Sequence, residues 1–471
     1  MIASPVFAGK SYAVLGLARS GRAVVEALAA SGAEIMAWDQ SPQAREDLAK
    51  LLPGTGRGTA RTAVEGGERS EHGGVGPLHQ PAAGPPPRSR EELVRIADPL
   101  VTALYGYDGI VVSPGVPLNR HPIAARAREA GVPLIGDIEL FALARPTLPP
   151  HKVVGITGTN GKSTTTALVH HICRTAGLPT TMAGNIGYPI LGQEPLVPNE
   201  RGAGIYVLEL SSYQIDLTSS LDCEVSVLLN ISPDHLDRYD GVDDYAASKA
   251  RLFAMQSADH VAVIAADDDH SRAIAGQVAG RKVLVSAVQA KDQSRWPSLQ
   301  GPHNAQNVAA AVAVARALGI ADAVIASALA SYRGLPHRME RVAERNGVLY
   351  VNDSKATNPN SAAPALAAYP KVHWILGGLP KSDDLEPCEP FLDHVRAAYT
   401  IGEAGPMFAQ LLEGKVPVRR CEMLHEAVSC AASAAEPGEV VLLSPACASF
   451  DQFRDYEARG DAFRAAVEAL R

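Results

Sequence analysis

The sequence predicts an α/β protein with three domains, and three observations support this prediction. First, the chain has 471 residues, and single domains usually contain roughly 100–200. Second, short apolar runs alternate with segments of helical spacing, which is typical of parallel sheets covered by helices. Third, 46% of the residues are apolar and 20% are charged, as in ordinary globular proteins. We therefore expect domains at residues 1–146, 151–334 and 335–471.

The first domain begins with a βαβ unit and continues as a parallel sheet. The expected strands are residues 12–17, 34–39, 109–113 and 133–136, and the expected helices are residues 22–30 and 123–130. Residues 53–90 interrupt this pattern, because they are rich in Gly, Pro and Arg and have no apolar period. We expect a flexible surface insertion without packed structure there.

The other two domains repeat the alternation of strands and helices. In the second domain we expect strands at residues 153–156, 205–210, 225–230, 261–265 and 282–285, and helices at 245–255, 305–318 and 320–330. In the third domain we expect strands at residues 348–351, 373–376, 399–401 and 440–443, and helices at 361–368, 395–398, 407–412 and 461–470. The third domain is therefore predicted to be a second doubly wound unit.

Charge and cysteine content narrow the function classes. The formal net charge of −8 argues against a general nucleic-acid-binding protein, which usually has a basic face. The six cysteines form no CxxC pair and have no zinc-ligand spacing, which fits reduced thiols in a cytosolic protein. The apolar run at residues 12–17 is too short to span a membrane, and no cleavage site follows a charged start. We therefore expect a cytoplasmic protein with no nucleic-acid or membrane partner.

The segment HKVVGITGTNGKSTTTALVHHI predicts a phosphate-binding loop between a buried strand and a helix. Gly158 and Gly161 allow backbone N–H groups to turn towards phosphates. Lys162 supplies a positive charge, and Ser163 offers a hydroxyl group to magnesium. Ile156 stands where the general pattern has its first glycine, so the strict spacing is not met. An ordinary strand-to-helix turn that happens to contain Lys-Ser is the alternative.

Three further candidate residues follow the phosphate loop in the sequence. Glu209 closes an apolar strand, a position at which carboxylates hold magnesium in nucleotide-hydrolysing folds, although many strand-end glutamates are only solvated caps. His235 lies in a polar turn after the next strand, and Lys249 lies on the helix that follows. A satisfied loop histidine and a surface lysine are the respective alternatives.

Polar groups also follow three strands of the third domain. The segments are NDSKATN at residues 352–358, the Gly-Gly turn and lysine at 377–381, and SPACASFD at 444–451. Ligands bind at the carboxyl ends of strands in open α/β sheets, so we expect these segments to share one rim. Asn304 and Asn307 begin an Ala-rich helix, where they either cap the helix or bind a nucleotide.

Together these motifs resemble those of the Mur ligases, the ATP-dependent enzymes that build the peptide stem of peptidoglycan. The shared motifs are, in chain order, GTNGKSTTT, GNIG, LELSSYQ, PDHLDRY, SKARLF, HNAQN, GLPHRME and NDSKATN. The segments GDIELF and SPACASFDQF are similar to the family member that adds D-glutamate. The resemblance covers nearly the whole chain outside the insertion. It implies a Rossmann-like UDP-binding domain, a central P-loop ATPase-type domain and a Rossmann-like C-terminal domain that binds the amino acid.

The resemblance also implies roles for individual residues. The expected catalytic residues are Lys162, Glu209, His235, Lys249 and Lys355. The expected ATP contacts are Gly158, Thr159, Asn160, Gly161, Lys162, Ser163, Thr164, Asn304, Asn307, Arg338 and Asp353. The expected UDP-substrate contacts are Leu17, Ala18, Arg19, Ser20, Asp39, Gln40, Ser113, Gly115, Asn185 and His235. The expected D-glutamate contacts are Thr357, Lys381, Ser449, Phe450 and Tyr456. The expected metal-site residues are Ser163, Glu209, His235 and Lys249, the last as a carbamate.

The implied reaction has three small-molecule substrates and needs magnesium. ATP would phosphorylate the carboxylate of UDP-N-acetylmuramoyl-L-alanine, and the amine of D-glutamate would then displace phosphate. A carbamate on Lys249 fits this scheme, because a free ammonium (pKa ~10.4) repels a cation while a carbamate supplies an oxygen ligand. The family also suggests a monomer.

The sequence departs from the family pattern at a few positions. Ala18 interrupts the GxGxxG pattern of the first turn, so dinucleotide binding is poorly supported. Gln40 and Ser41 stand where some members have Arg, and Tyr456 stands where some have Phe. The first two positions bear on the UDP contacts and the third on the amino-acid pocket.

Other functions remain as alternatives at this point. Another Mur ligase that adds a different amino acid is the nearest, but the third domain contains no Asp-Asn-Pro-Arg signature. Folylpolyglutamate synthase shares the ATPase core and lacks a first domain of this type. A catalytically inactive nucleotide-binding protein is disfavoured by the intact charged residues, and a nicotinamide-dependent dehydrogenase by the interrupted glycine pattern.

Overall fold

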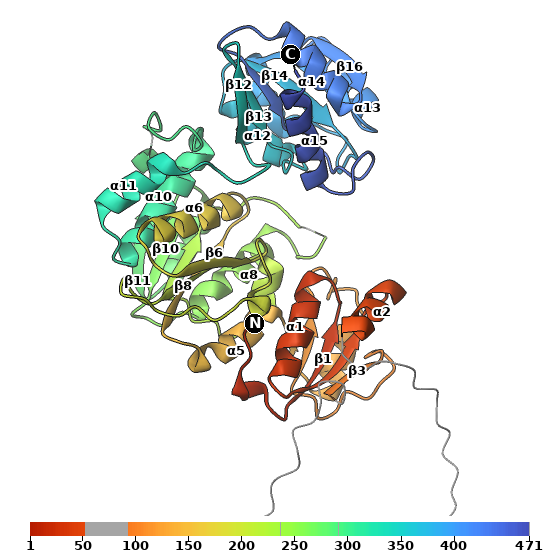
Figure 1. The fold of residues 1–471 in the computed structure, drawn as a ribbon, viewed down its shortest axis with the longest axis vertical. Helices are drawn as coiled ribbons and strands as arrows, with labels where there is room; N and C mark the ends of the chain where they lie inside the picture. The colour runs from red at the N-terminus through yellow and green to blue at the C-terminus, as the bar shows by residue number, and fades with distance from the viewer. Residues whose placement is uncertain (52–92, 236, 291, 471) are drawn as a thin grey trace, which may run out of the picture. The chain divides into compact units, whose positions relative to one another are not determined.

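The computed structural model describes residues 1–51, 93–235, 237–290 and 292–470 (Figure 1). The expected insertion at 53–90 lies outside these residues. The chain divides into two compact units. The first unit comprises Met1–Leu148, Tyr188–Pro195 and Asp216–Leu221, and the second comprises Pro149–Gly187, Leu196–Ile215 and Asp222–Arg471. Both units contain helices and mainly parallel sheets, so the predicted α/β class is confirmed, while the three-domain boundaries stay a prediction.

The first unit contains a five-stranded parallel sheet in the order β3-β2-β1-β4-β5. Its strands are β1 (Ser11–Leu15), β2 (Glu34–Trp38), β3 (Val94–Ile96), β4 (Gly109–Val112) and β5 (Leu134–Ile135). Its helices are α1 (Arg19–Ala30), α2 (Pro42–Leu51), α4 (Ile123–Ala130) and α5 (Asp137–Ala144). Helix α1 lies against β1 because Gly21, in its first turn, has no side chain: a Cβ there would overlap the carbonyl oxygen of Gly16.

The first sheet of the second unit has six parallel strands in the order β11-β10-β9-β6-β8-β7. The strands are β6 (His151–Thr157), β7 (Thr180–Gly184), β8 (Gly204–Glu209), β9 (Val225–Leu228), β10 (Val261–Ala265) and β11 (Arg281–Val285). The helices are α6 (Lys162–Thr175), α7 (Ser212–Asp216), α8 (Val242–Ala254), α9 (Asp269–Gln277), α10 (Pro302–Ala317) and α11 (Asp322–Ser331).

Alternate residues of the central strands face opposite layers of this sheet. Val227 belongs to the core shared with α6, α10 and α11, and its neighbour Leu228 belongs to the core shared with α8 and α9. Every residue of β8 is buried, as expected for a strand covered on both faces. The carboxyl ends of β6, β8 and β9 are therefore held side by side by a fully packed sheet.

The second sheet of this unit has the order β12-β13-β17-β14-β15-β16, and only the β12–β13 pair is antiparallel. The strands are β12 (Glu340–Arg345), β13 (Val348–Asn352), β14 (Val372–Gly377), β15 (Val395–Ile401), β16 (Val418–Glu422) and β17 (Val440–Leu443). The helices are α12 (Pro359–Ala367), α13 (Gly405–Leu412), α14 (Leu424–Ala434) and α15 (Tyr456–Glu468).

One predicted helix is wrong. Residues 395–398 belong to β15, which begins at Val395 directly after the 3-10 helix Glu386–His394. The Ala-rich segment is short, and its pairing with β14 on one side and β16 on the other decides its conformation. The strands β3, β7, β12 and β16 and the helices α2, α5, α7, α9 and α14 were not predicted.

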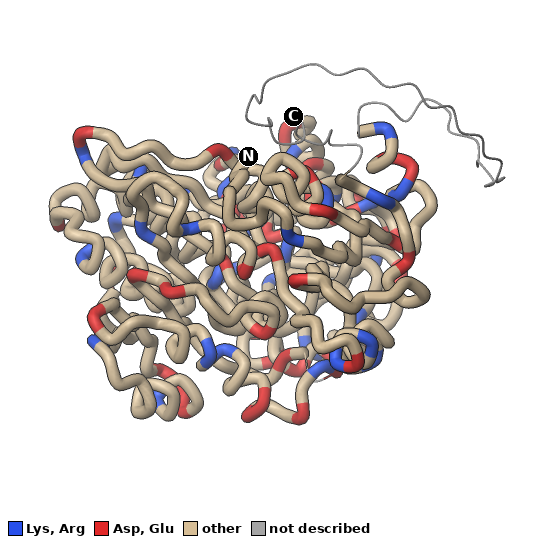
Figure 2. Tube along the Cα trace, turned by 90° about the horizontal axis from the view of Figure 1, so that it is seen from below, with Lys and Arg blue, Asp and Glu red and all other residues tan. Residues whose placement is uncertain are grey.

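Positive and negative residues are interspersed along the described trace (Figure 2). Within that trace, no helix combines the length and the apolar character that crossing a membrane would require.

Candidate active site

The loop between β6 and α6 has the conformation that its glycines predict. Gly158 has φ +149° and Gly161 has φ +85°, values that L side chains rarely adopt. The Lys162 ammonium donates hydrogen bonds to the carbonyl oxygens of Gly158 (2.8 Å) and Thr159 (2.7 Å). Desolvation lowers the pKa of Lys162, and the nearby carboxylate of Glu209 opposes this shift. The loop thus presents a partly desolvated cation at the N-terminus of a 14-residue helix, which suits a phosphate.

Glu209 lies at the end of β8 and is only 2% exposed. Its Oε1 accepts a hydrogen bond from Asn185 Nδ2 at 2.9 Å. Its Oε2 is also buried but has no hydrogen-bond partner among the described residues. A buried carboxylate oxygen without a donor is costly unless something else binds it, and a divalent cation is a suitable partner. This oxygen fits the magnesium that the sequence predicts, while the described residues contain no cluster of three or more His, Cys, Asp or Glu side chains that could hold a metal by themselves.

His235 follows β9 and has φ +55°, an unusual backbone conformation for a residue with a side chain. Its ring lies 5.0 Å from that of Tyr213, and its Nε2 lies 3.5 Å from a carboxylate oxygen of Asp234. Burial lowers the pKa of His235, and Asp234 opposes this effect. The imidazole is therefore biased towards its neutral form at the mouth of the site.

Lys249 is almost completely buried, with 1% of its surface exposed, so the surface-lysine alternative is wrong. Its Nζ lies 3.5 Å from Thr157 Oγ1 and 4.4 Å from the centre of the Tyr245 ring. Thr157 is the last residue of β6, so the amine lies beneath the start of the phosphate loop.

Asp353 and Lys355 lie directly after β13. Asp353 Oδ2 accepts a hydrogen bond from Ser444 Oγ (2.9 Å), and Oδ1 accepts one from the Met339 amide (3.2 Å). Burial raises the pKa of Asp353 to about 7. Burial and the neighbouring arginine lower the pKa of Lys355 to about 8, and its ammonium lies 4.9 Å from the Tyr456 ring centre.

Two hydrogen bonds involve further predicted residues. Arg338 Nη2 donates to Ser163 Oγ at 2.8 Å, and the buried Nε of the same arginine has no partner among the described residues. Lys381 Nζ donates to Thr357 Oγ1 at 3.3 Å.

One cavity of about 860 Å³ brings most of these residues together. The predicted residues that line it are Thr159, Asn160, Gly161, Lys162, Ser163, Asn185, Glu209, His235, Arg338, Asp353, Lys355, Thr357, Lys381 and Tyr456. Polar lining residues that were not predicted are Asp234, Asp237, Asn358, Asn360, Ser361, Ser382 and Asp384. Asp234 and Asp237 belong to the PDHLDRY motif, so their position next to His235 in the sequence could have predicted that they line the site. Nothing in the sequence around Asp384 predicts that it lines the cavity.

A smaller adjoining cavity of about 110 Å³ holds three more predicted residues, Thr164, Asn304 and Asn307. It shares Asn160, Gly161, Arg338, Asp353 and Ser361 with the larger one. His303 also lines it, with a buried and unpartnered Nδ1 within the described chain, and burial lowers the pKa of this histidine to about 4. A neutral histidine and several amides suit a nucleobase better than a phosphate.

Other predicted residues lie elsewhere. Gly158 and Lys249 do not line either cavity, and neither do Ser449, which is buried, and Phe450, which is 68% exposed. In the first unit, the turns after β1, β2 and β4 carry the predicted UDP contacts. There the amide of Leu17 donates to Asp39 Oδ2 at 2.7 Å. The same turns contain Ala18, Gln40, Ser113 and Gly115, and Arg19 and Ser20 are the first residues of α1.

Family models match two parts of the chain. The model described as the Mur ligase middle domain matches residues 156–298. The model described as the Mur ligase glutamate ligase domain matches residues 337–447. Over its full length the chain is 61% identical to a protein of Novosphingobium aromaticivorans, of which it covers 97%. It is 55% identical to a protein of Zymomonas mobilis over the full length of both. Both relatives are named UDP-N-acetylmuramoylalanine–D-glutamate ligase.

Solved structures share the fold at much lower identity. The UDP-N-acetylmuramate-alanine ligase of Thermotoga maritima is 16% identical, with a TM-score of 0.53 over 98% of this chain and 99% of that one. The MurF ligase of the same organism, solved with ADP, is 18% identical, with a TM-score of 0.55 over 77% of this chain and 90% of that one.

Proposed function

The chain belongs to the Mur ligase family of ATP-dependent ligases, and we propose that its 860 Å³ cavity is where D-glutamate is joined to UDP-N-acetylmuramoyl-L-alanine. The observation that carries this proposal is the composition of that cavity. It combines a phosphate loop, a buried carboxylate with a free oxygen, and lysines from the C-terminal sheet.

The first step activates the acid. A carboxylate is a poor electrophile, so its oxygen attacks the γ-phosphorus of ATP, the bond to the β-phosphate oxygen breaks, and ADP leaves. Two anions must approach each other in this step, so cationic groups dominate its catalysis. Lys162 and Lys355 are the ammonium groups of the cavity that we assign to it, and the Arg338 guanidinium, which donates to Ser163 Oγ, adds a third positive charge.

The second step forms the amide bond. The uncharged amine of D-glutamate attacks the acyl carbon, a tetrahedral intermediate forms, and inorganic phosphate leaves as the nitrogen loses a proton to solvent. We assign the D-glutamate carboxylates to Lys381 and Thr357, which already share a hydrogen bond, with Tyr456 beside them. We keep Ser449 and Phe450 as further contacts of this substrate.

Magnesium is part of the proposal, with Glu209, Ser163 and His235 as the side chains that would hold it. When bound, the metal would screen the charge of the phosphates. Lys249, which is buried next to Thr157, would contribute as a carbamate, because a carbamate supplies the oxygen ligand that a free ammonium cannot. The first unit would hold the UDP group through its strand-end turns.

Phosphate release from ATP tests the proposal. The purified protein is supplied with UDP-N-acetylmuramoyl-L-alanine and a panel of amino acids, and only D-glutamate should stimulate release. Release with L-alanine or diaminopimelate instead would identify a different ligase of the family. Absence of ATP binding would contradict the proposal altogether.

We also propose that the protein acts as a cytoplasmic monomer of three domains. This proposal rests on the resemblance to the Mur ligases. Size-exclusion chromatography with light scattering tests the monomer.

A further inference from the structure

Arg459 is a buried arginine that the reaction scheme above does not use. It lies on α15, is 1% exposed, and is among the largest fully buried side chains of the described chain. Its five N–H donors match five acceptor oxygens, so the guanidinium is fully satisfied. Nε donates to Ser354 Oγ (3.0 Å), and Nη2 donates to the carbonyl oxygens of Ser354 (2.8 Å) and Cys447 (3.0 Å). Nη1 donates to the carbonyl oxygens of Ala448 (3.1 Å) and Gly377 (3.4 Å).

The acceptors are unusual because none of them is a carboxylate. Four are backbone carbonyls and one is a hydroxyl, so none of the five hydrogen bonds pairs the buried charge with a carboxylate, although Asp451 is near enough to favour the charged form. Burial lowers the pKa of Arg459 to about 10, which still leaves the group protonated at neutral pH. Burying a charge without a counter-ion costs stability, and a well-packed apolar residue often serves a core better. A purely structural need does not account for this choice.

The acceptors come from three loops that follow neighbouring strands. Ser354 follows β13, Gly377 ends β14, and Cys447 and Ala448 follow β17, which lies between those two strands. Each loop carries residues assigned above to the reaction: Lys355 is next to Ser354, Lys381 follows the Gly377 turn, and Ser449 follows Ala448.

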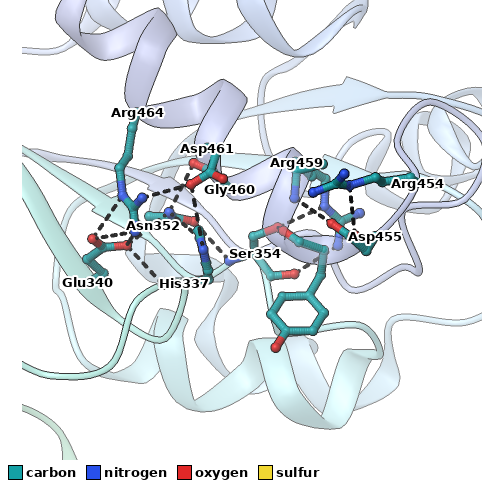
Figure 3. A network of polar contacts seen from close by, with 12 residues as sticks. His337, Glu340, Asn352, Ser354, Arg454, Asp455, Arg459, Gly460, Asp461 and Arg464 are labelled. Carbon is teal, nitrogen blue, oxygen red and sulfur yellow. Dashed lines mark hydrogen bonds and ion pairs between the residues drawn. The ribbon is translucent and has the colours of Figure 1, made fainter. Parts of the chain in front are cut away.

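The packing around the guanidinium leaves little freedom. A Cβ at Gly378 would lie 2.9 Å from Arg459 Nη1, at a φ of +132°. Leu379 and Ala448 exchange two backbone hydrogen bonds of 3.0 Å across the same turn. Ser354 Oγ accepts from Arg459 and donates to the carbonyl oxygen of Tyr456 at 2.8 Å, which also fixes the first residue of α15 (Figure 3).

We infer that Arg459 is a positioning residue, which sets the spacing of the three loops so that the activated acid near Lys355 and the amino acid near Lys381 are held in register. This inference rests on the proposed function. A planar fork of five donors can hold three loops at once, whereas a lysine has three donors on a single nitrogen and cannot. The arginine itself does not line the cavity, so it would act only through the loops that it holds.

The test uses Arg459→Lys in the full-length protein. We expect KM for D-glutamate to rise at least tenfold with a fall in kcat, while the dissociation constant of ADP changes less than this, since Asp353 is the only assigned ATP contact in the loops that Arg459 holds and the phosphate loop lies on the other sheet. The matched control is Arg345→Lys. Arg345 also donates to backbone carbonyls, those of Glu468 and Leu470 at the far end of α15, and it should keep the wild-type KM.

The outcomes separate this inference from the proposed function. If the wild-type protein shows no release of phosphate that depends on D-glutamate, the proposed function fails and the inference fails with it. If the wild type is active and folded Arg459→Lys keeps its KM for D-glutamate, the inference alone is overturned. An equal rise in KM in Arg345→Lys would also overturn it, because loosening of α15 would then be the cause.

Ser354→Ala is a second variant in case Arg459→Lys does not fold. It removes one acceptor of the guanidinium and the link to Tyr456, and leaves the other four contacts in place. We expect KM for D-glutamate to rise about threefold with unchanged ADP affinity. A folded Ser354→Ala protein with wild-type KM would overturn the inference.

Discussion

Replacing Asp353 by Asn should stabilise the protein above neutral pH. Burial raises the pKa of Asp353 from an ordinary 3.8 to about 7, so the folded state holds this proton more tightly than the unfolded chain. Such a group favours folding most below pH 4, and its contribution is lost as pH rises towards 7. At pH 8 the folded protein carries a buried charge that the unfolded chain solvates freely.

The amide should fit the site without a new polar mismatch. The Asn Oδ1 can accept from the Met339 amide as the carboxylate does now, at 3.2 Å. The Asn Nδ2 would replace the oxygen that accepts from Ser444 Oγ at 2.9 Å, and that hydroxyl can turn round and accept instead. Because both contacts can be kept, removal of the charge should dominate the effect.

The magnitude follows from the pKa shift. One pKa unit corresponds to 1.36 kcal/mol, so Asn should stabilise the fold by roughly 4 kcal/mol at pH 8 and by roughly 1.6 kcal/mol at pH 5. The difference between the stabilisation at pH 8 and the stabilisation at pH 5 is the more specific test, since effects of the substitution that do not depend on ionisation cancel in it. Since we propose that Asp353 acts on the nucleotide side of the site, the same variant should lose phosphate release.

Urea unfolding followed by tryptophan fluorescence measures this effect. The chain has three tryptophans, and Trp374 is buried in the same sheet, with its indole N–H donating to the Ser444 carbonyl at 2.8 Å. A background with Trp38→Phe and Trp296→Phe would leave Trp374 as the only reporter. Asp393→Asn, which removes a carboxylate that is 81% exposed, is the control. A stability gain that is absent, or equal at pH 5 and pH 8, would refute the reasoning.

Three other variants test separate parts of the structure. Lys249→Ala should abolish phosphate release, and added short carboxylic acids should restore part of it. Full activity of this variant without added acids would count against the carbamate. Glu139→Gln should destabilise the first unit by about 2–3 kcal/mol, because the buried carboxylate accepts four hydrogen bonds from Ser219 and Ser220. Urea unfolding followed by the fluorescence of Trp38 measures this loss, and an unchanged unfolding midpoint would contradict the prediction. Gly161→Ala should weaken ADP binding at least tenfold, as measured by calorimetry. A methyl group at this position would overlap Asn307 Oδ1, and the φ of +85° is unfavourable for alanine. Wild-type affinity would show that the loop can adjust.

The central strands and the phosphate loop could be predicted from the sequence because their signals are local. Buried parallel strands such as β8 are continuous apolar runs, and the glycines of the loop are required by its backbone. The strands that were missed are short or lie at sheet edges. The strand β7 is mostly half-buried, and β12 and β16 expose charged residues such as Glu344 and Glu422, so neither carries an apolar run.

The site was only partly predictable for a related reason. Motifs indicate which residues matter, but burial and partners come from tertiary packing. The sequence gives no sign that Lys249 is buried beneath the loop, that Glu209 Oε2 lacks a donor, or that Asp384 reaches the cavity. Arg459 was missed altogether, since an arginine among alanines on a C-terminal helix reads as a solvated residue.

The strand order of the second sheet has a consequence for protein synthesis. The strand β17 is inserted between β13 and β14, both of which leave the ribosome before it. Until Val440 to Leu443 and then α15 emerge, β13 and β14 have no partner between them and the guanidinium that links their loops does not yet exist. A nascent chain that stalls before Val440 would therefore carry a finished nucleotide loop and no acceptor pocket, with two unpaired strand edges exposed to chaperones and proteases.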